Sequence, residues 1–284
     1  MPKLWHFPIR ATENLATGKN LITLRNALQR LGQEAAVLVT VLDALGSVPR
    51  SSGTRMLVFA DHFTATVGGG HLEFQAIAHA RQMLAGHTSE QQVRHVLGPS
   101  LGQCCGGVVE LGFERVGAAD AQRVAQLLTP VRQPVALFGG GHVGRAIVQT
   151  LVTLPFAVRW IDSRDEIFPD TVPDGVVCEH SSPVQAAVTD LAPGSRVLIM
   201  SFSHAEDLDI VMACLRRIRE RRDLPFVGLI GSKTKWATFR HRLEHRGFAP
   251  HEIDAITCPI GIPGIVGKEP EVIAIATAAQ LLLL

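Results

Sequence analysis

Residues 134–144 read PVALFGGGHVG, an apolar run followed at once by three glycines and then by a fourth at position 144. The apolar run predicts a buried strand over residues 134–138, and the GxGxxG spacing predicts a tight turn that opens a helix. Strand-like runs then alternate with helical stretches to the end of the chain. This alternation is typical of βαβ units and predicts a Rossmann-like parallel sheet over residues 134–284.

The glycine loop is a candidate phosphate site. Gly139 permits the tight turn, Gly141 lets the backbone approach a phosphate, and Gly144 lets the helix pack on the strand. His142 lies inside the loop, and the helix that begins there offers free N–H groups and the positive end of its dipole. Asp162 ends the next predicted strand, where an acid accepts ribose hydroxyls in dinucleotide-binding proteins. The alternative is a Rossmann fold whose loop binds no nucleotide.

The segment before residue 118 differs in character, because short strand-like runs are separated there by glycine-rich loops. It predicts a smaller α+β domain over residues 1–117 that also carries a Cys-Cys loop. Residues 118–133 predict a linker helix between this domain and the Rossmann-like domain. The expected fold class is therefore α/β, with a C-terminal parallel sheet and a smaller N-terminal α+β domain.

Two loops of this first part carry candidate binding residues. Arg50 and Arg55 flank a loop rich in hydroxyls and glycine, and arginine pairs bidentately with phosphate. His71 and Glu73 follow three glycines that open a predicted helix, a second possible seat for an anion. The structural alternatives are a solvated polar turn for the first loop and a favourable helix-dipole interaction of Glu73 for the second.

The adjacent thiols of Cys104 and Cys105 stand among glycines, in the loop GQCCGG of residues 102–107. Thiolates favour soft metals, and flanking glycines let a ligand approach the backbone closely. The alternative is two small residues packed in a turn. Cys178 and Cys214 are predicted to pack in the core, and Cys258 before a proline is open to either interpretation.

Composition narrows the class of protein further. The 284 residues are 46% hydrophobic and 19% charged, with 27 basic and 26 acidic side chains, so we expect a chain with a substantial core and no nucleic-acid or membrane partner. No apolar stretch approaches the ~20 residues that span a bilayer, and the N-terminal residues do not have the pattern of a signal peptide. Five cysteines, two of them adjacent, form a poor disulfide framework, which favours a cytoplasmic location.

Taken together, these motifs resemble the XdhC/CoxI family of xanthine dehydrogenase accessory proteins. The matching pieces, in family order, are GSVPRSSGTRMLV (46–58), GGGHLE (68–73), GQCCGG (102–107), ALFGGGHVG (136–144), SHAEDL (203–208), GSKTK (231–235) and CPIG (258–261). Each piece is weak alone, but the ordered set is specific.

The resemblance implies a cytoplasmic, dimeric factor that is not a turnover enzyme. Such a factor binds molybdenum cofactor (molybdopterin), protects it, supports its sulfuration by a cysteine desulfurase and inserts it into apo-xanthine dehydrogenase. Cys104 and Cys105 would be the residues at the molybdenum, and the Rossmann loop would hold a dinucleotide, the molybdopterin phosphate or nothing. The alternative function is an NAD(P)-dependent oxidoreductase with Asp162 on the ribose.

Overall fold

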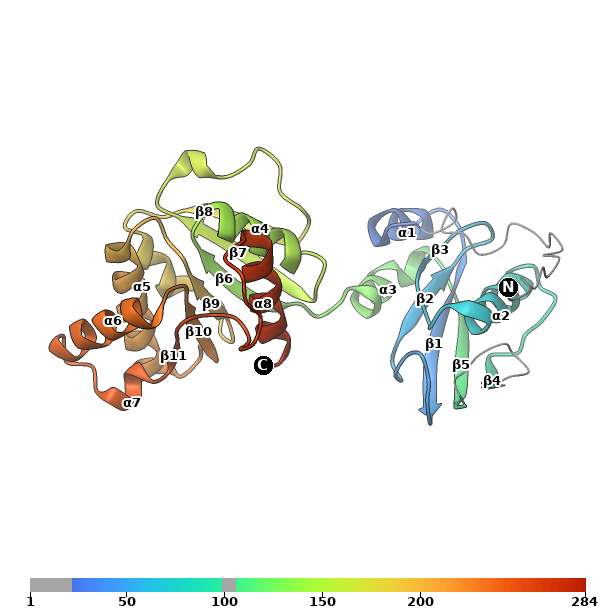
Figure 1. Ribbon diagram of the computed structural model, residues 1–284. Helices are drawn as coiled ribbons and strands as arrows, with labels where there is room; N and C mark the ends of the chain where they lie inside the picture. The colour runs from blue at the N-terminus through green and yellow to red at the C-terminus, as the bar shows by residue number, and fades with distance from the viewer. Residues whose placement is uncertain (1–21, 99–105) are drawn as a thin grey trace, which may run out of the picture. The chain divides into compact units, whose positions relative to one another are not determined.

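The computed structural model describes residues 22–98 and 106–284. The chain divides into two compact units, Met1–Pro130 and Val131–Leu284, each with its own sheet (Figure 1). This division lies within the stretch 118–133 for which the sequence predicts a linker helix.

The first unit is built on a five-stranded antiparallel sheet in the order β3-β2-β1-β5-β4. The strands are β1 (Ala36–Leu45), β2 (Arg55–Val58), β3 (Phe63–Ala65), β4 (Gln92–Val96) and β5 (Val108–Val116). The first half of β1 is buried on both faces, which explains its nearly continuous apolar sequence. Val37 and Val39 face a core shared with Leu72 and Ala76 of helix α2, whereas Leu38 belongs to a second core on the opposite face.

In the described part of this unit, the sheet is covered by helices α1 (Leu24–Leu31), α2 (Gly70–Leu84) and α3 (Ala121–Leu128), the last preceded by a 3₁₀ turn (Ala118–Asp120). Val124 of α3 is fully buried in one core with Ala27 and Leu31 of α1. The helix predicted as a linker is therefore part of the first unit, because its apolar face is buried there.

The second unit is a six-stranded parallel sheet in the order β11-β10-β9-β6-β7-β8. Its strands are β6 (Gln133–Phe138), β7 (Phe156–Asp162), β8 (Val176–His180), β9 (Arg196–Ile199), β10 (Phe226–Leu229) and β11 (Ile256–Thr257). Counted from β6, this is the 3-2-1-4-5-6 order of the doubly wound Rossmann sheet, which confirms the predicted fold class. The strand order reverses between β6 and β9, where such sheets bind ligands at their carboxyl ends.

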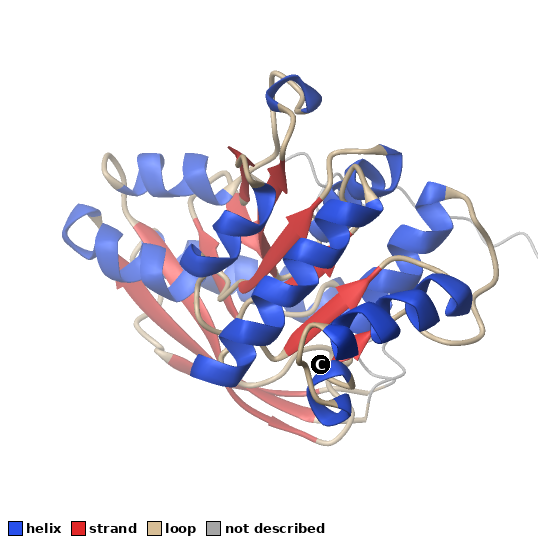
Figure 2. Ribbon diagram, turned by 90° about the vertical axis from the view of Figure 1, so that its left-hand side faces the viewer, coloured by secondary structure: helices blue, strands red, loops and turns tan. Residues whose placement is uncertain are grey.

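Helices cover both faces of the parallel sheet, and Figure 2 shows them layered against its strands. They are α4 (His142–Leu151), α5 (His204–Arg221), α6 (Lys233–His245), α7 (Pro250–Ile253) and α8 (Pro270–Leu282), with 3₁₀ segments at Asp165–Ile167 and Val184–Asp190. Leu137 of β6 packs with α4 and α8, which lie side by side (Figure 1), whereas Phe138 packs with α5. In the described residues, no helix combines the length and the apolar composition needed to cross a membrane.

Candidate functional site

The glycine loop of the second unit leaves the carboxyl end of β6 and opens α4. A Cβ on Gly139 would lie 2.1 Å from the carbonyl oxygen of Met200, and a Cβ on Gly144 would lie 2.0 Å from the carbonyl oxygen of Gly139. Both glycines are therefore required by backbone packing, as the motif predicts. Around Gly141 the space is open, and His142 beside it is exposed.

Asp162 ends β7 at this loop, and its side chain is already fully engaged by the protein. Its Oδ2 accepts the N–H of Gly140 at 2.6 Å and Nη2 of Arg164 at 2.9 Å, while Oδ1 accepts the backbone N–H and Nε of Arg164, both at 2.9 Å. Burial would raise the pKa of this carboxyl, but the Arg164 and Gly140 hydrogen bonds outweigh it and hold the pKa below its usual range. The structure thus brings Asp162 to the glycine loop, in an arrangement that does not favour ribose binding.

Three residues that the sequence patterns did not single out complete this edge of the sheet. The guanidinium carbon of Arg164 lies 4.5 Å from the ring centre of Phe202, which follows β9 and is 67% exposed. A Cβ on Gly140 would lie 2.6 Å from Cγ1 of Ile167, so Ile167 covers the loop at that point. The position of Arg164, two residues after Asp162, could have identified it from the sequence, because an arginine near this acid occurs in sites that bind a ribose phosphate.

The residues of SHAEDL and GSKTK meet at the carboxyl ends of β9 and β10. Ser203 caps α5 by accepting the N–H of Glu206 at 3.2 Å, as its capping role predicts. The buried carboxylate of Asp207 accepts the backbone N–H and the hydroxyl of Ser201, at 2.8 and 2.7 Å, and the ammonium of Lys235 at 2.6 Å. Lys235 also donates to the carbonyl of Ile230 at 2.8 Å, so this network fixes the two loops to each other.

Cys258 joins the same edge from the end of β11. A Cβ on Gly231 would lie 2.9 Å from Cδ of Lys235 and 3.2 Å from Sγ of Cys258, so the lysine stem and the thiol flank one glycine. Burial raises the pKa of the Cys258 thiol, and the opposing effect of Lys235 is smaller. The thiol is therefore protonated at neutral pH and packs as a small apolar group. Cys214 is fully buried, as predicted. Cys178 on β8 also packs against the core, as predicted, but remains partly exposed.

In the first unit, three of the predicted loops come together. A Cβ on Gly107, just before β5, would lie 2.5 Å from the carbonyl oxygen of Leu45 and 2.6 Å from that of Ser47. A Cβ on Gly68 would lie 2.5 Å from Cγ of Pro49. The β1–β2 loop therefore contacts both the triple-glycine loop and the residues that follow the Cys-Cys pair. Cys104 and Cys105 themselves lie outside the described residues.

The triple-glycine loop has a backbone that only glycine adopts easily, with φ of 141°, 73° and 60° at Gly68, Gly69 and Gly70. Glu73 holds this loop in place, because its Oε2 accepts the hydroxyl of Thr66 and, at 3.3 Å, the N–H of Gly69. Glu73 thus stabilises the conformation of this loop through hydrogen bonds inside it.

The other predicted site residues of this unit differ in their exposure and in the hydrogen bonds that they already make. Arg55 donates from Nη1 to the carbonyl of Gly53 at 3.0 Å, within its own loop. Arg50 is exposed, and so is His71, whose Nε2 lies 3.0 Å from Nε2 of Gln75. Among the described residues, no cluster of three or more His, Cys, Asp or Glu side chains has the arrangement of a metal site.

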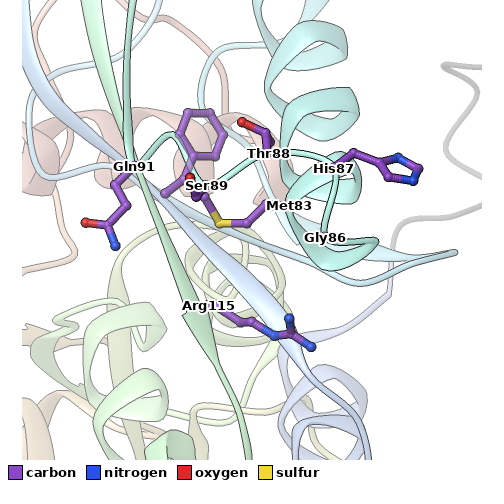
Figure 3. Close-up of a pocket in the computed structure, with 8 residues that line it drawn as sticks. Met83, Gly86, His87, Thr88, Ser89, Gln91 and Arg115 are labelled. Carbon is purple, nitrogen blue, oxygen red and sulfur yellow. The ribbon is translucent and has the colours of Figure 1, made fainter.

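A depression of 670 Å³ lies elsewhere in the first unit, between the end of α2 and β5. It is lined mainly by polar side chains, among them His87, Gln91 and Arg115, and contains none of the predicted site residues. Figure 3 shows these three side chains extending away from one another rather than towards a common point. This depression is therefore not the candidate site.

An antiparallel unit with converging glycine loops, followed by a doubly wound Rossmann unit, defines the class of this protein. Residues 30–96 match the family model described as the XdhC and CoxI family, and residues 135–281, more than half of the chain, match the XdhC Rossmann domain. The chain belongs to the XdhC and CoxI family, which confirms the resemblance drawn from its motifs.

Two known proteins are similar to this chain. YqeB of Escherichia coli K12, described as uncharacterized, is 28% identical over 257 residues, which cover 86% of this chain and 42% of YqeB. The chain therefore spans less than half the length of that relative. A crystal structure from Bacillus halodurans, described as a xanthine dehydrogenase, superposes with a TM-score of 0.70 at 20% identity, over 90% of this chain and 94% of that one. At 20% identity, the similarity to the Bacillus halodurans structure shows a shared fold and nothing further.

Proposed function

We propose that this protein is a xanthine dehydrogenase accessory factor rather than an enzyme. It binds molybdenum cofactor, protects it, supports its sulfuration and inserts it into apo-xanthine dehydrogenase. The observation that carries the proposal is the convergence of the Gly46–Gly53, Gly68–Gly70 and Gly106–Gly107 segments in the first unit. Family membership supports it, because the Gly46–Gly53 and Gly68–Gly70 segments lie within residues 30–96, which match the XdhC and CoxI family model.

The cofactor combines a phosphate, a flat pterin and a dithiolene-bound metal. Each unit separately offers a group suited to an anion, namely exposed Arg50 in the first unit and the N–H groups at the start of α4 in the second. Cys104 and Cys105 are the proposed contacts to molybdenum, because thiolate is a soft donor. When bound, the group supplies a redox-active metal that the client enzyme uses after transfer.

The partners of this function are apo-xanthine dehydrogenase as the client and a cysteine desulfurase as the source of sulfur. We propose that the factor acts as a homodimer in the cytoplasm. The alternative, an NAD(P)-dependent oxidoreductase, is less well supported for NAD, because both oxygens of Asp162 already accept hydrogen bonds from Arg164. For NADP, the one observation in its favour is the position of Arg164, where an arginine can bind the ribose phosphate.

The test is the cofactor content of the full chain, expressed in a host that makes molybdenum cofactor. We expect the purified protein to yield the fluorescent oxidation product of the pterin, and to transfer cofactor to purified apo-xanthine dehydrogenase. In Cys104→Ser, Cys105→Ser and the double variant the content should fall while the melting temperature stays close to wild type. A wild-type protein without bound pterin would refute the proposal, and unchanged content in the double variant would remove the thiols from it.

Cys214→Ser provides the matched control. Cys214 is fully buried, and burial raises its pKa to about 12, so it packs as an apolar group. A hydroxyl in its place lacks a partner, and we expect a loss of stability of about 1–3 kcal/mol. The pterin bound per folded molecule should not change.

A further inference from the structure

We propose that the glycine loop of the second unit binds a single phosphomonoester, and that Arg164, held by Asp162, selects it. The ligand class is a compound with one terminal phosphate, not a dinucleotide. The inference rests on the proposed function in one respect, because molybdopterin carries such a phosphate. A mononucleotide is the other source of the same chemistry.

The first step concerns Asp162, which has no oxygen left for a ribose. Its carboxylate is 2% exposed and accepts four hydrogen bonds, one from Gly140 and three from Arg164. A ribose diol would have to displace a bidentate, charge-assisted pair, which is among the stronger hydrogen-bonded contacts in proteins. Asp162 is therefore a positioning residue for Arg164.

The second step concerns the part of Arg164 that remains available. A guanidinium has five N–H groups, of which Nε and one on Nη2 are given to Asp162. In the described part of the chain, Nη1 has no hydrogen-bond acceptor. One face of the guanidinium stacks on Phe202, while the side chain stays 36% exposed. An arginine fixed on two sides with a free N–H edge is pre-organised for a phosphate.

The third step concerns the loop, which is closed on one side and open on the other. Ile167 covers Gly140, on the side of Asp162 where the adenosine ribose of a dinucleotide would lie. Nothing lies within 4 Å of the Cβ position of Gly141, at the first N–H groups of α4. Gly140 and Arg164 donate to the same oxygen of Asp162, so the guanidinium lies close to Gly140, the residue before the open position. The loop is thus open at Gly141, where a phosphate would bind, whereas Ile167 and the engaged carboxylate of Asp162 occupy the side on which a dinucleotide places its ribose.

The test is an NMR titration of the full chain with inorganic phosphate at pH 8, where the dianion dominates. The amides of Gly141, His142 and Val143 and the Nε–H of Arg164 should shift together and saturate. Arg164→Gln should weaken phosphate binding at least tenfold, and Arg164→Lys should restore part of it. Asp162→Asn should also weaken phosphate binding, because Arg164 then loses the carboxylate that holds it. Arg216→Gln, an exposed arginine on α5, should have no effect.

Two further arms complete the test. NAD⁺ and NADP⁺ should each leave the four signals unchanged. Saturable binding of either dinucleotide at these signals would overturn the inference. So would an absence of saturable phosphate shifts, or an unchanged phosphate affinity in Arg164→Gln. If the pterin content also falls in Arg164→Gln, the phosphate is that of molybdopterin. If Arg164→Gln lowers phosphate affinity but not pterin content, the phosphate site is confirmed and its ligand is a mononucleotide. A wild-type chain that binds phosphate but no pterin refutes only the proposed function.

Discussion

Arg164 donates to both carboxylate oxygens of Asp162, from Nε to Oδ1 and from Nη2 to Oδ2, each at 2.9 Å. The two residues are only two positions apart in the chain, and their ion pair fixes the backbone turn at the carboxyl end of β7. Because Oδ2 also accepts the N–H of Gly140, the pair ties β7 to the glycine loop after β6. In the dinucleotide-binding motif, the acid at the position of Asp162 binds a ribose, whereas here it stabilises the loop by hydrogen bonds to the protein itself.

Replacing Asp162 by Asn should destabilise the second unit. The amide nitrogen faces N–H donors and leaves at least one of them unpaired, which costs about 1–3 kcal/mol. Urea unfolding followed by circular dichroism measures the change. An unchanged unfolding midpoint would mean that these bonds contribute nothing net.

The same carboxyl predicts acid sensitivity. The folded state holds its pKa below the ordinary value of 3.8, so its contribution to stability is complete above that value and is lost as the pH falls through the lower, folded pKa. Wild-type protein should therefore lose stability more steeply than Asp162→Asn when urea unfolding is repeated below pH 4. Parallel pH profiles for the two proteins would contradict this expectation.

Gly144→Ala should damage the fold far more than Gly141→Ala. A Cβ at Gly144 would lie 2.0 Å from the carbonyl oxygen of Gly139, so α4 would have to shift away from the loop. The cost should be at the upper end of the about 1–3 kcal/mol typical of overpacking. Gly141 has φ of −69° and open space, so alanine there costs no more than about 1 kcal/mol. Thermal unfolding of the two variants compares them directly, and equal losses would show that the tight approach is not required.

Glu73→Gln should loosen the triple-glycine loop. The hydroxyl of Thr66 and the N–H of Gly69 both donate to one charged oxygen, Oε2. The neutral amide oxygen of Gln accepts the same two bonds more weakly, because hydrogen bonds to an ionised acceptor are about twice as strong. If this loop contributes to the cofactor site, bound pterin should fall several-fold with little change in melting temperature. Glu90→Gln, an exposed acid beyond α2, is the control. Normal pterin content in Glu73→Gln would show that the loop does not contribute.

His95 should make the first unit sensitive to mild acid. Burial and, to a smaller extent, nearby His79 lower its pKa, its Nδ1 lies 3.1 Å from Oε1 of Gln75, and its buried Nε2 has no partner among the described residues. Protons therefore bind the unfolded chain first, and stability should decline as the pH falls below about 6.5. His95→Gln should flatten this decline between pH 7 and pH 5 in chemical unfolding. A decline of the same size in both proteins would assign it to other groups.

The sequence by itself determined the order and class of most elements. A buried parallel strand is a continuous apolar run, and a glycine motif at its end opens a helix, so β6 and α4 follow from residues 134–151. The short α7 and β11 cannot be predicted from sequence, because four and two residues carry no periodicity. The helix α3 was recognised as a helix, but its place in the first unit depends on contacts of Val124 with residues almost a hundred positions away.

For the site, the sequence identified residue types and spacing, whereas the tertiary structure decided their partners. Asp162 was recognised from its distance to the glycine loop, but only the fold shows that Arg164 and Gly140 saturate it. Phe202 and Ile167 carry no motif, since a hydrophobic side chain becomes part of a site only through the strand order that brings it there. Hydrogen bonds and stacking depend on distances of a few ångströms between residues far apart in the chain, and spacing along the sequence does not contain them.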